Sequence, residues 1–229
     1  MINPGKQVNH KIRVKLPTKS SNSFLPIKLP RPKDLGGKTV MAALRHRMTV
    51  RELSSRKLPL QVLSNLLWAA FGVNRKNGPF GVAGRTAASA SNSQEIDIYI
   101  AMAEGVYLYE PTANCLNAVV AGDLRQFAIG QGQGKAGSNA PVRIIYVVDT
   151  AKFSKAGFQE PGLKDPEIQK SYYYIDTGLI AGNAAVYAAS QGMTAWFHNC
   201  QKSVLSDKLK LRASQRALFA QTIGWPSND

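Results

Sequence analysis

The sequence predicts a single α+β domain, in which helices pack on a sheet, preceded by a basic arm. Two observations favour this fold class. Segments with helical spacing of apolar residues alternate irregularly with strand-like segments, without the strand–helix–strand repetition of a parallel α/β fold. The length of 229 residues suits one domain, and the sequence contains no internal repeat.

The positive charge is concentrated near the N-terminus. The net charge is +15, and residues 1–60 contain 14 of the 29 Lys and Arg but only two of the 14 acidic residues. The first 38 residues contain nine basic residues and five prolines, which favour extended backbone. We therefore expect residues 1–38 to form an extended arm and residues 39–229 the domain. Two interpretations of the arm remain: it contacts an anionic surface, or it is simply exposed to solvent. Its few aromatic residues argue against nucleic acid as a partner.

Composition excludes several protein classes. A hydrophobic content of 44% is too high for a largely disordered chain. No stretch approaches the roughly 18 apolar residues of a membrane span, and no export signal opens the chain. We therefore expect a cytoplasmic protein, although a mature exported protein would have the same features. The two cysteines, Cys115 and Cys200, and the three histidines lack metal-ligand spacing, so we expect two buried thiols and no metal site.

Two helices are expected in the first third of the chain. Residues 39–47 place Val40, Met41 and Leu44 on one helical face. Residues 60–71 follow a proline, have apolar residues at helical spacing, and end before Gly72, a suitable C-terminal cap. Residues 74–93 are rich in Gly, Asn, Ser and Ala and predict a long loop, which in a compact domain is usually functional.

The rest of the chain predicts a sheet with further helices. Residues 95–102 alternate as in a strand with one buried face, which carries Ile96, Ile98 and Ile100. Gly105 and residues 106–109 suggest a hairpin return. The later elements are a central strand at 141–149, a small-residue helix at 172–190, a strand at 193–197, a helix at 203–211 capped by Ser203, and a strand at 218–223.

Familiar catalytic motifs are missing. Residues 132–137 match G-x-G-x-x-G, but they precede a strand rather than a helix, so they predict a flexible loop and no dinucleotide site. No G-x-S-x-G hydrolase motif occurs. If the protein is an enzyme, a bound organic cofactor is the natural source of its chemistry.

Two polar segments remain as candidate sites. In residues 47–51, Arg47, Thr49 and Arg51 alternate at a helix-to-loop junction and can converge on one phosphate. In residues 85–94, the amides of Asn92 and Gln94 suit the edge of a heterocycle with alternating carbonyl and N–H groups. A solvated basic face and a polar turn are the simpler interpretations of the same residues.

Together these segments resemble the nitroreductase family of flavin mononucleotide (FMN) enzymes. Residues 47–51 are similar to the family pattern R-[RH]-[ST]-x-[RK], and residues 88–94 to P-S-x-x-N-x-Q. The resemblance covers residues 27–226. Within the family, the sequence is most similar to the branch that contains the SagB-type dehydrogenases and their stand-alone relatives. This similarity lies in the segments 58–75, 176–183, 192–195 and 221–226.

This resemblance implies a nitroreductase-like fold, with a central, mostly antiparallel sheet flanked by helices, and a homodimer whose site draws on both subunits. Arg47, Thr49, Arg51 and the backbone of Met48 would hold the FMN phosphate and ribityl chain. Asn92 would bond the pyrimidine edge of the ring. The remaining residues implied are Ser89, Ser91 and Gln94 beside Asn92, Arg85 close to cofactor or substrate, and His198, Asn199 and Cys200 where backbone approaches flavin N5.

The implied activity is ping-pong hydride transfer. NADH or NADPH would reduce the flavin, which then reduces a small-molecule acceptor such as a nitroaromatic or quinone. No side-chain acid or base is expected; His198 is only a weak candidate for a proton donor. Met48 and Ala88 depart from the family motifs, which puts FMN affinity in question. The alternatives are a flavin-dependent dehydrogenase of a peptide or natural product, and a non-catalytic flavin- or nucleic-acid-binding protein.

Overall fold

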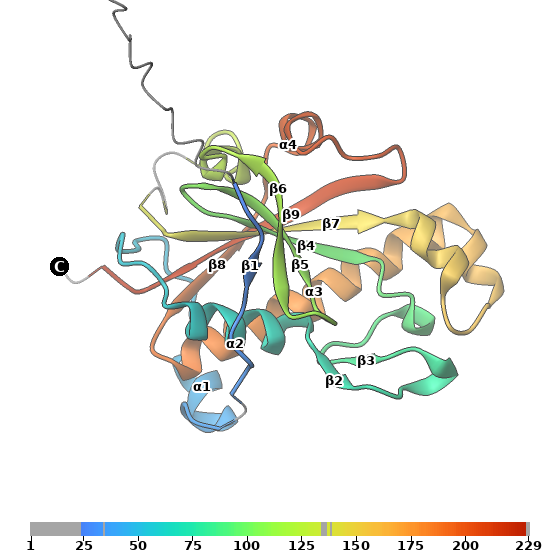
Figure 1. Ribbon diagram of the computed structural model, residues 1–229, viewed down its shortest axis with the longest axis horizontal. Helices are drawn as coiled ribbons and strands as arrows, with labels where there is room; N and C mark the ends of the chain where they lie inside the picture. The colour runs from blue at the N-terminus through green and yellow to red at the C-terminus, as the bar shows by residue number, and fades with distance from the viewer. Residues whose placement is uncertain (1–23, 34, 134–136, 138, 228–229) are drawn as a thin grey trace, which may run out of the picture.

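The computed structural model describes residues 24–33, 35–133, 137 and 139–227. Its centre is a seven-stranded sheet of order β1-β6-β5-β4-β7-β9-β8, in which every neighbouring pair is antiparallel (Figure 1). The α+β fold class and the antiparallel sheet are therefore confirmed. The strands are β1 Ile27–Lys28, β4 Ile96–Ala101, β5 Gly105–Glu110, β6 Cys115–Ala121, β7 Val142–Asp149, β8 Thr194–His198 and β9 Gln215–Gly224.

Helices cover both faces of this sheet. α2 (Leu60–Phe71) and α3 (Pro166–Ser190) lie on one face, and α4 (Lys202–Lys208) lies on the other (Figure 1). Accordingly, Ile144 and Tyr146 of β7 belong to the core beneath α2 and α3, whereas Ile145 belongs to the core beneath α4. The predicted strand at 95–102 was expected to bury one face only. This was wrong, because the α4 layer also buries Tyr99.

Local signals account for the helix ends. α1 (Val40–His46) begins where Thr39 Oγ1 accepts a hydrogen bond from the backbone N–H of Ala42 (3.3 Å). α2 has the predicted bounds, 60–71, and Gly72 is its C-cap, with extended rather than left-handed backbone. α3 begins at Pro166 rather than at residue 172. There the Asp165 carboxylate accepts from the N–H of Glu167 (2.8 Å), and proline suits the first helical position.

Several predicted details were wrong. The loop expected at 74–93 contains an antiparallel pair, β2 (Val73–Arg75) and β3 (Gly84–Arg85), and two short 3-10 turns, Pro79–Gly81 and Ala90–Asn92. The cap of α4 is Gln201 and not Ser203, and β9 begins before residue 218. Strands β1 and β6 were not predicted. Cys200 is buried as expected, whereas Cys115 is only partly buried.

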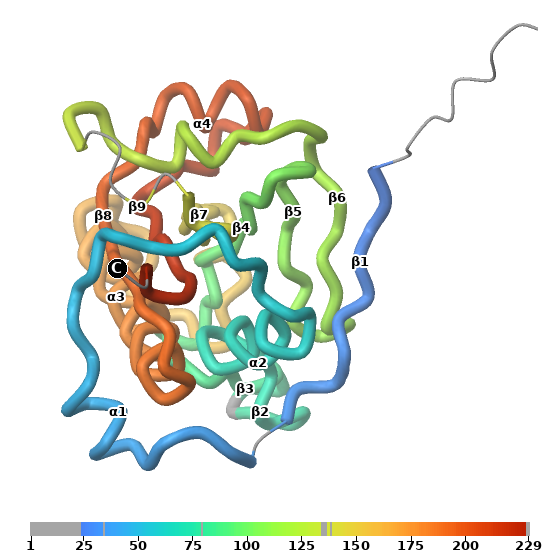
Figure 2. Tube along the Cα trace, turned by 90° about the vertical axis from the view of Figure 1, so that its left-hand side faces the viewer, coloured from blue at the N-terminus to red at the C-terminus, as the bar shows by residue number. Residues whose placement is uncertain are grey.

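Part of the expected N-terminal arm is built into the fold. Phe24 packs on Tyr107 with ring centroids 4.6 Å apart, and β1 pairs with β6. The segment formed by residues 29–33 and 35–38, which we call the strap, is hydrogen-bonded to α2 and then reaches α1 (Figure 2). Its ends are fixed by backbone bonds from Leu29 N–H to Asn114 O (3.1 Å) and from Lys38 N–H to Ser190 O (3.0 Å). Residues 1–23 lie outside the described residues.

No helix in the described part of the chain is both long and apolar enough to span a bilayer.

Candidate functional site

The first predicted segment, residues 47–51, runs along the edge of the sheet. Arg47 is the C-cap of α1, and from there the chain is extended. Thr49 forms a parallel bridge with Ala195 of β8, the outermost strand on this side. Arg47, Met48, Thr49 and Arg51 are exposed. The helix-to-loop junction expected from the sequence is therefore confirmed, and it places these side chains beside β8.

A small positively charged cavity of about 170 Å³ lies at this junction. Arg47 and Met48 line it together with Lys38 and His46, against Ala189 and other residues at the end of α3 and the start of β8. Lys38 and Arg47 carry full positive charges, whereas the C-terminal ends of α1 and α3 contribute only partial negative charge. The cavity therefore favours an anion.

Arg51 follows in the same extended segment and does not line this cavity. Its guanidinium carbon is 5.4 Å from the ring centroid of Trp196 in β8. Its backbone carbonyl accepts from the N–H of Gly137 (2.8 Å), and the Gly137 carbonyl accepts from Nη2 of the buried Arg143 (2.6 Å). Burial lowers the pKa of Arg143 to about 10. Gly137, the end of the glycine-rich segment 132–137, thus packs against the edge of the sheet, and β7 is the next element of the described chain.

The second predicted segment, residues 85–94, is a tightly bonded turn. Ser91, Asn92 and Gln94 have φ angles of 49°, 53° and 50°, in the left-handed region that non-glycine residues rarely adopt. Ser89 Oγ accepts from the N–H of Gln94 (3.0 Å), and Nε2 of Gln94 donates to Asn92 Oδ1 (2.9 Å). These bonds hold the loop in a conformation that costs free energy, which is common at functional sites.

The same loop contains unpaired polar atoms. Nδ2 of Asn92 and Nη1 of Arg85 are buried and have no hydrogen-bond partner among the described residues. Nε of Arg85 donates to Gln94 Oε1 (2.6 Å), and the guanidinium lies 5.3 Å from the ring of Phe71. Burial lowers the pKa of Arg85, partly opposed by Glu110. Arg85 therefore supports the loop, while Asn92 retains a donor for a ligand.

Two buried carboxyl groups that were not predicted from the sequence lie beneath this loop. Glu95 is fully buried, and Ser93 Oγ donates to its Oε2 (2.6 Å). Asp176 of α3 accepts from the N–H of Ala90 (2.9 Å). Burial, with the charge of Glu95, raises the pKa of Asp176 to about 8. A signal was nevertheless present in the sequence, since Asp176 is four residues before Ile180, on the face of α3 that packs into the core.

The third predicted segment, residues 198–200, contains no available acid. Nδ1 of His198 lies 2.9 Å from the carbonyl of Asn199, and Nε2 lies 2.8 Å from Thr222 Oγ1. Because a carbonyl only accepts, Nδ1 carries the proton and Nε2 accepts from the threonine. Burial lowers the pKa of His198 to about 4, so the ring is neutral near pH 7. Burial also raises the pKa of Cys200 to about 11. These contacts favour a structural His198.

The predicted segments are not all adjacent within one chain. Residues 47–51 lie beside β8, and residues 198–200 are the end of β8 and the two residues after it. The 85–94 loop bonds to Asp176, whereas the cavity at Arg47 contacts Ala185 and Ala189 near the end of the same helix. At 1.5 Å per residue, Asp176 and Ala185 are about 14 Å apart along α3. The Asn92 loop and the Arg47 cavity therefore contact different levels of α3.

The elements that line the Arg47 cavity carry a set of exposed large apolar side chains. We call it the apolar face; its members are Val40, Met41 and Leu44 of α1, Met48, Ile175 and Leu179 of α3, and Phe197 of β8. Their exposed fractions range from 40% for Phe197 to 76% for Met41. Large exposed apolar residues gathered in this way are typical of a surface that another molecule covers.

The antiparallel sheet flanked by helices, with two polar segments at its sides, defines an α+β fold. The nitroreductase family model matches residues 44–225. A crystal structure of a "putative nitroreductase" from Ralstonia eutropha JMP134 is 31% identical, with a TM-score of 0.78 over 91% of this chain and 92% of that chain. The chain therefore belongs to the nitroreductase family and is an oxidoreductase.

Two other relatives extend the comparison. A "putative nitroreductase" of Methanocaldococcus jannaschii is 26% identical over 153 residues, which are 62% of this chain and 75% of the relative. The fold is also shared with a chain of the E. coli microcin synthetase McbBCD complex, solved with truncated pro-MccB17 bound. That likeness has a TM-score of 0.64 at 15% identity and covers 96% of this chain and 85% of that chain.

Proposed function

We propose that the protein is an FMN-dependent oxidoreductase that takes hydride from NADH or NADPH and passes it to a small acceptor such as a nitroaromatic or quinone. Family membership supports the reaction class. The observation that carries the cofactor proposal is the buried, unpaired Nδ2 of Asn92 in its left-handed loop. A heterocycle carbonyl would accept from this donor and remove the free-energy cost of an unsatisfied buried group.

The residues of the first segment fit the other end of such a cofactor. Arg47 lines a cavity that favours an anion, and Thr49 and Arg51 follow it along β8. We propose that Arg47, Thr49 and Arg51 hold the FMN phosphate and ribityl chain, with Met48 contributing its backbone. Ser89 and Gln94 keep Asn92 in place, and Arg85 fixes Gln94. Ser91 lies beside Asn92 in the same turn.

When bound, FMN would supply the hydride chemistry, and the protein would supply binding and orientation. The N–H of Cys200 already donates to Asn199 Oδ1 (3.0 Å). We therefore propose that the backbone of His198 and Asn199 is the part of this segment that faces the ring. Because both ring nitrogens of His198 are bonded, we propose no proton transfer from it.

We also propose a homodimer in which the two subunits complete one site. The separation of the two polar segments along α3 supports this, because a second subunit can bring its own 85–94 loop to the Arg47 cavity. The apolar face supports it too, since docking would bury Met41 and Leu179. A flavin bound there would lie at the interface.

The visible spectrum of the purified protein tests the cofactor proposal. We expect a yellow protein, or a colourless one that becomes yellow with added FMN, and bleaching by NADH or NADPH without oxygen. A protein that neither contains nor takes up FMN would contradict the proposal. Replacing Arg47 and Arg51 together by alanine should release the flavin, whereas Lys155→Ala, at an exposed site, should not.

The same experiment separates the alternatives. A yellow protein that no nicotinamide bleaches would favour a dehydrogenase of a peptide or natural product, or a non-catalytic flavin protein. The microcin synthetase chain shares the fold at 15% identity, which supports a common architecture and leaves the substrate open.

A further inference from the structure

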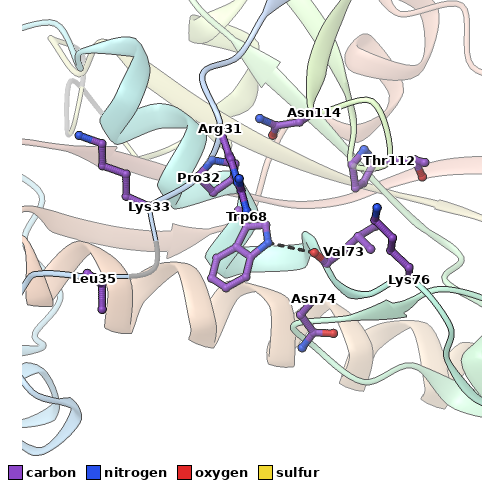
Figure 3. Close-up of a pocket in the computed structure, with 11 residues that line it drawn as sticks. Arg31, Pro32, Lys33, Leu35, Trp68, Val73, Asn74, Lys76, Thr112 and Asn114 are labelled. Atoms are coloured by element: carbon purple, nitrogen blue, oxygen red, sulfur yellow. Dashed lines mark hydrogen bonds between the residues drawn. The ribbon is translucent and has the colours of Figure 1, made fainter.

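A large cavity lies away from the candidate flavin site. It has a volume of about 610 Å³ and opens between the strap, the end of α2, the segment after β2, and the turn that joins β5 to β6 (Figure 3). This volume is within the range of small-molecule sites, about 300–1,000 Å³. None of its lining residues belongs to the segments 47–51, 85–94 or 198–200.

Three cations line this cavity. Arg31 and Lys33 come from the strap, and Lys76 comes from the connection between β2 and β3. The described lining residues include no carboxylate; Asp34, between Lys33 and Leu35 in sequence, lies outside the described residues. Charges that reach one cavity from two separate segments favour an anionic ligand.

A tryptophan occupies the middle of the cavity. In Figure 3 the Trp68 indole lies between Lys33 and Leu35 on one side and Asn74 and Lys76 on the other. Its Nε1 donates to the carbonyl of Val73 (3.0 Å), which fixes the ring plane. Gly72 packs against the indole so closely that a Cβ there would lie 2.4 Å from Trp68 Cδ1. The ring is therefore held in one orientation and can serve as a stacking platform.

Polar groups beside the platform can bond a heterocycle. Asn114, with φ of 47°, donates through Nδ2 to the carbonyl of Pro30 (2.8 Å), and this bond ties the turn between β5 and β6 to the strap. Its Oδ1 is buried, without a partner among the described residues. Asn74 and Thr112 add further donors and acceptors to the lining.

We infer that this cavity is a second ligand site, for a phosphorylated planar heterocycle of mononucleotide size. Its ring stacks on Trp68, its polar ring atoms bond Asn74 and Thr112, and its phosphate lies beside Arg31 and Lys76, with Lys33 on the opposite side of the ring. A simple inorganic anion would leave Trp68 unused, and a neutral heterocycle would leave the cations unused. The site does not depend on flavin binding, so it stands or falls separately from the proposed reaction.

Calorimetric titration of the purified full-length protein with AMP at low salt tests this inference. We expect saturable binding of one AMP per chain that weakens as salt increases. Lys76→Ala and Arg31→Ala should each weaken binding about five-fold, which corresponds to about 1 kcal/mol. Trp68→Ala should weaken it at least five-fold, because base stacking on an aromatic residue is lost. Trp68→Phe keeps a ring and should retain most of the affinity.

Lys155→Ala removes an exposed lysine outside this lining and is the matched control; it should change nothing. Adenosine and inorganic phosphate, titrated separately, should each bind much more weakly than AMP. Equal affinity for pyrophosphate and AMP would overturn the inference, because the surface would then attract any anion. So would AMP binding that Arg47→Ala abolishes, or a short oligothymidylate that binds far more tightly than AMP. An absence of saturable AMP binding would overturn it directly.

Discussion

The substitution Asp176→Asn should make the stability of the folded protein less sensitive to alkaline pH. In the wild type, the Asp176 carboxyl is buried beside Glu95 and accepts from the N–H of Ala90. Burial and the charge of Glu95 raise the pKa of Asp176 from 3.8 to about 8. Between these values the folded state keeps a proton that the unfolded state has lost, so stability falls as pH rises. Asparagine keeps an acceptor for Ala90 and removes this titration.

The structure sets the size of the effect. A single proton changes the free energy of unfolding by at most about 1.4 kcal/mol per pH unit. From about pH 5 to about pH 8, the upper limit is therefore about 4 kcal/mol. Rearrangement of the protein around the ionised carboxyl will reduce this cost. We therefore expect the free energy of unfolding of the variant to rise by about 2 kcal/mol relative to that of the wild type over this pH range. For a chain of this length, that equals about 4–8 °C in Tm.

Urea unfolding and thermal unfolding across this pH range measure the difference. Both should be done on the protein without FMN, so that ligand affinity does not enter. Glu167→Gln is the control: it changes an exposed carboxyl in the first turn of the same helix, paired loosely with Lys170 (3.6 Å). A difference between Asp176→Asn and wild type that stays constant from pH 5 to pH 8 would refute the reasoning, as would a variant destabilised only at high pH.

Three further predictions concern the site, the interface and the core. Asn92→Ala should weaken FMN binding about ten-fold, measured by fluorescence titration, whereas the exposed Thr112→Ala should not. Leu179→Glu places a charge on the apolar face and should shift a dimer toward monomer in light scattering; an unchanged mass would exclude this face from the interface. Leu66→Ala, in the core under α2, should cost about 2–5 kcal/mol in chemical unfolding, and a loss below about 1 kcal/mol would contradict its burial.

The sequence was most informative where a local signal marks both ends of an element. The bounds of α2 were predicted as observed, because Pro59 and Gly72 flank a run with helical spacing. The central strand β7 was recognisable from its continuous apolar run. By contrast, the capping signal of Ser203 was wrong, since several polar residues there could start a helix and Gln201 does. β1 has only two residues and exists because it pairs with β6.

At the candidate site, too, local features were predicted from the sequence, whereas contacts between separate segments were not. The motifs placed Arg47 at the end of a helix and Asn92 in a loop, and the structure has both there. No motif indicated that Arg85 bonds Gln94, or that Asp176 supports the loop from another element. The first bond depends on how the loop folds back on itself, and the second joins residues far apart in the chain. No local pattern specifies which of these pairs will meet.

The sequence by itself determined the elements with strong local periodicity, the family, and the order of the polar segments. Only the tertiary structure decided which strand faces are buried, how far apart the polar segments lie along α3, and that Arg31, Lys33 and Lys76 surround Trp68. The physical reason is that helix and strand periodicity arises between residues close in the chain. Burial, pKa shifts and cavities arise from packing between distant residues, which becomes defined only when the whole domain has folded.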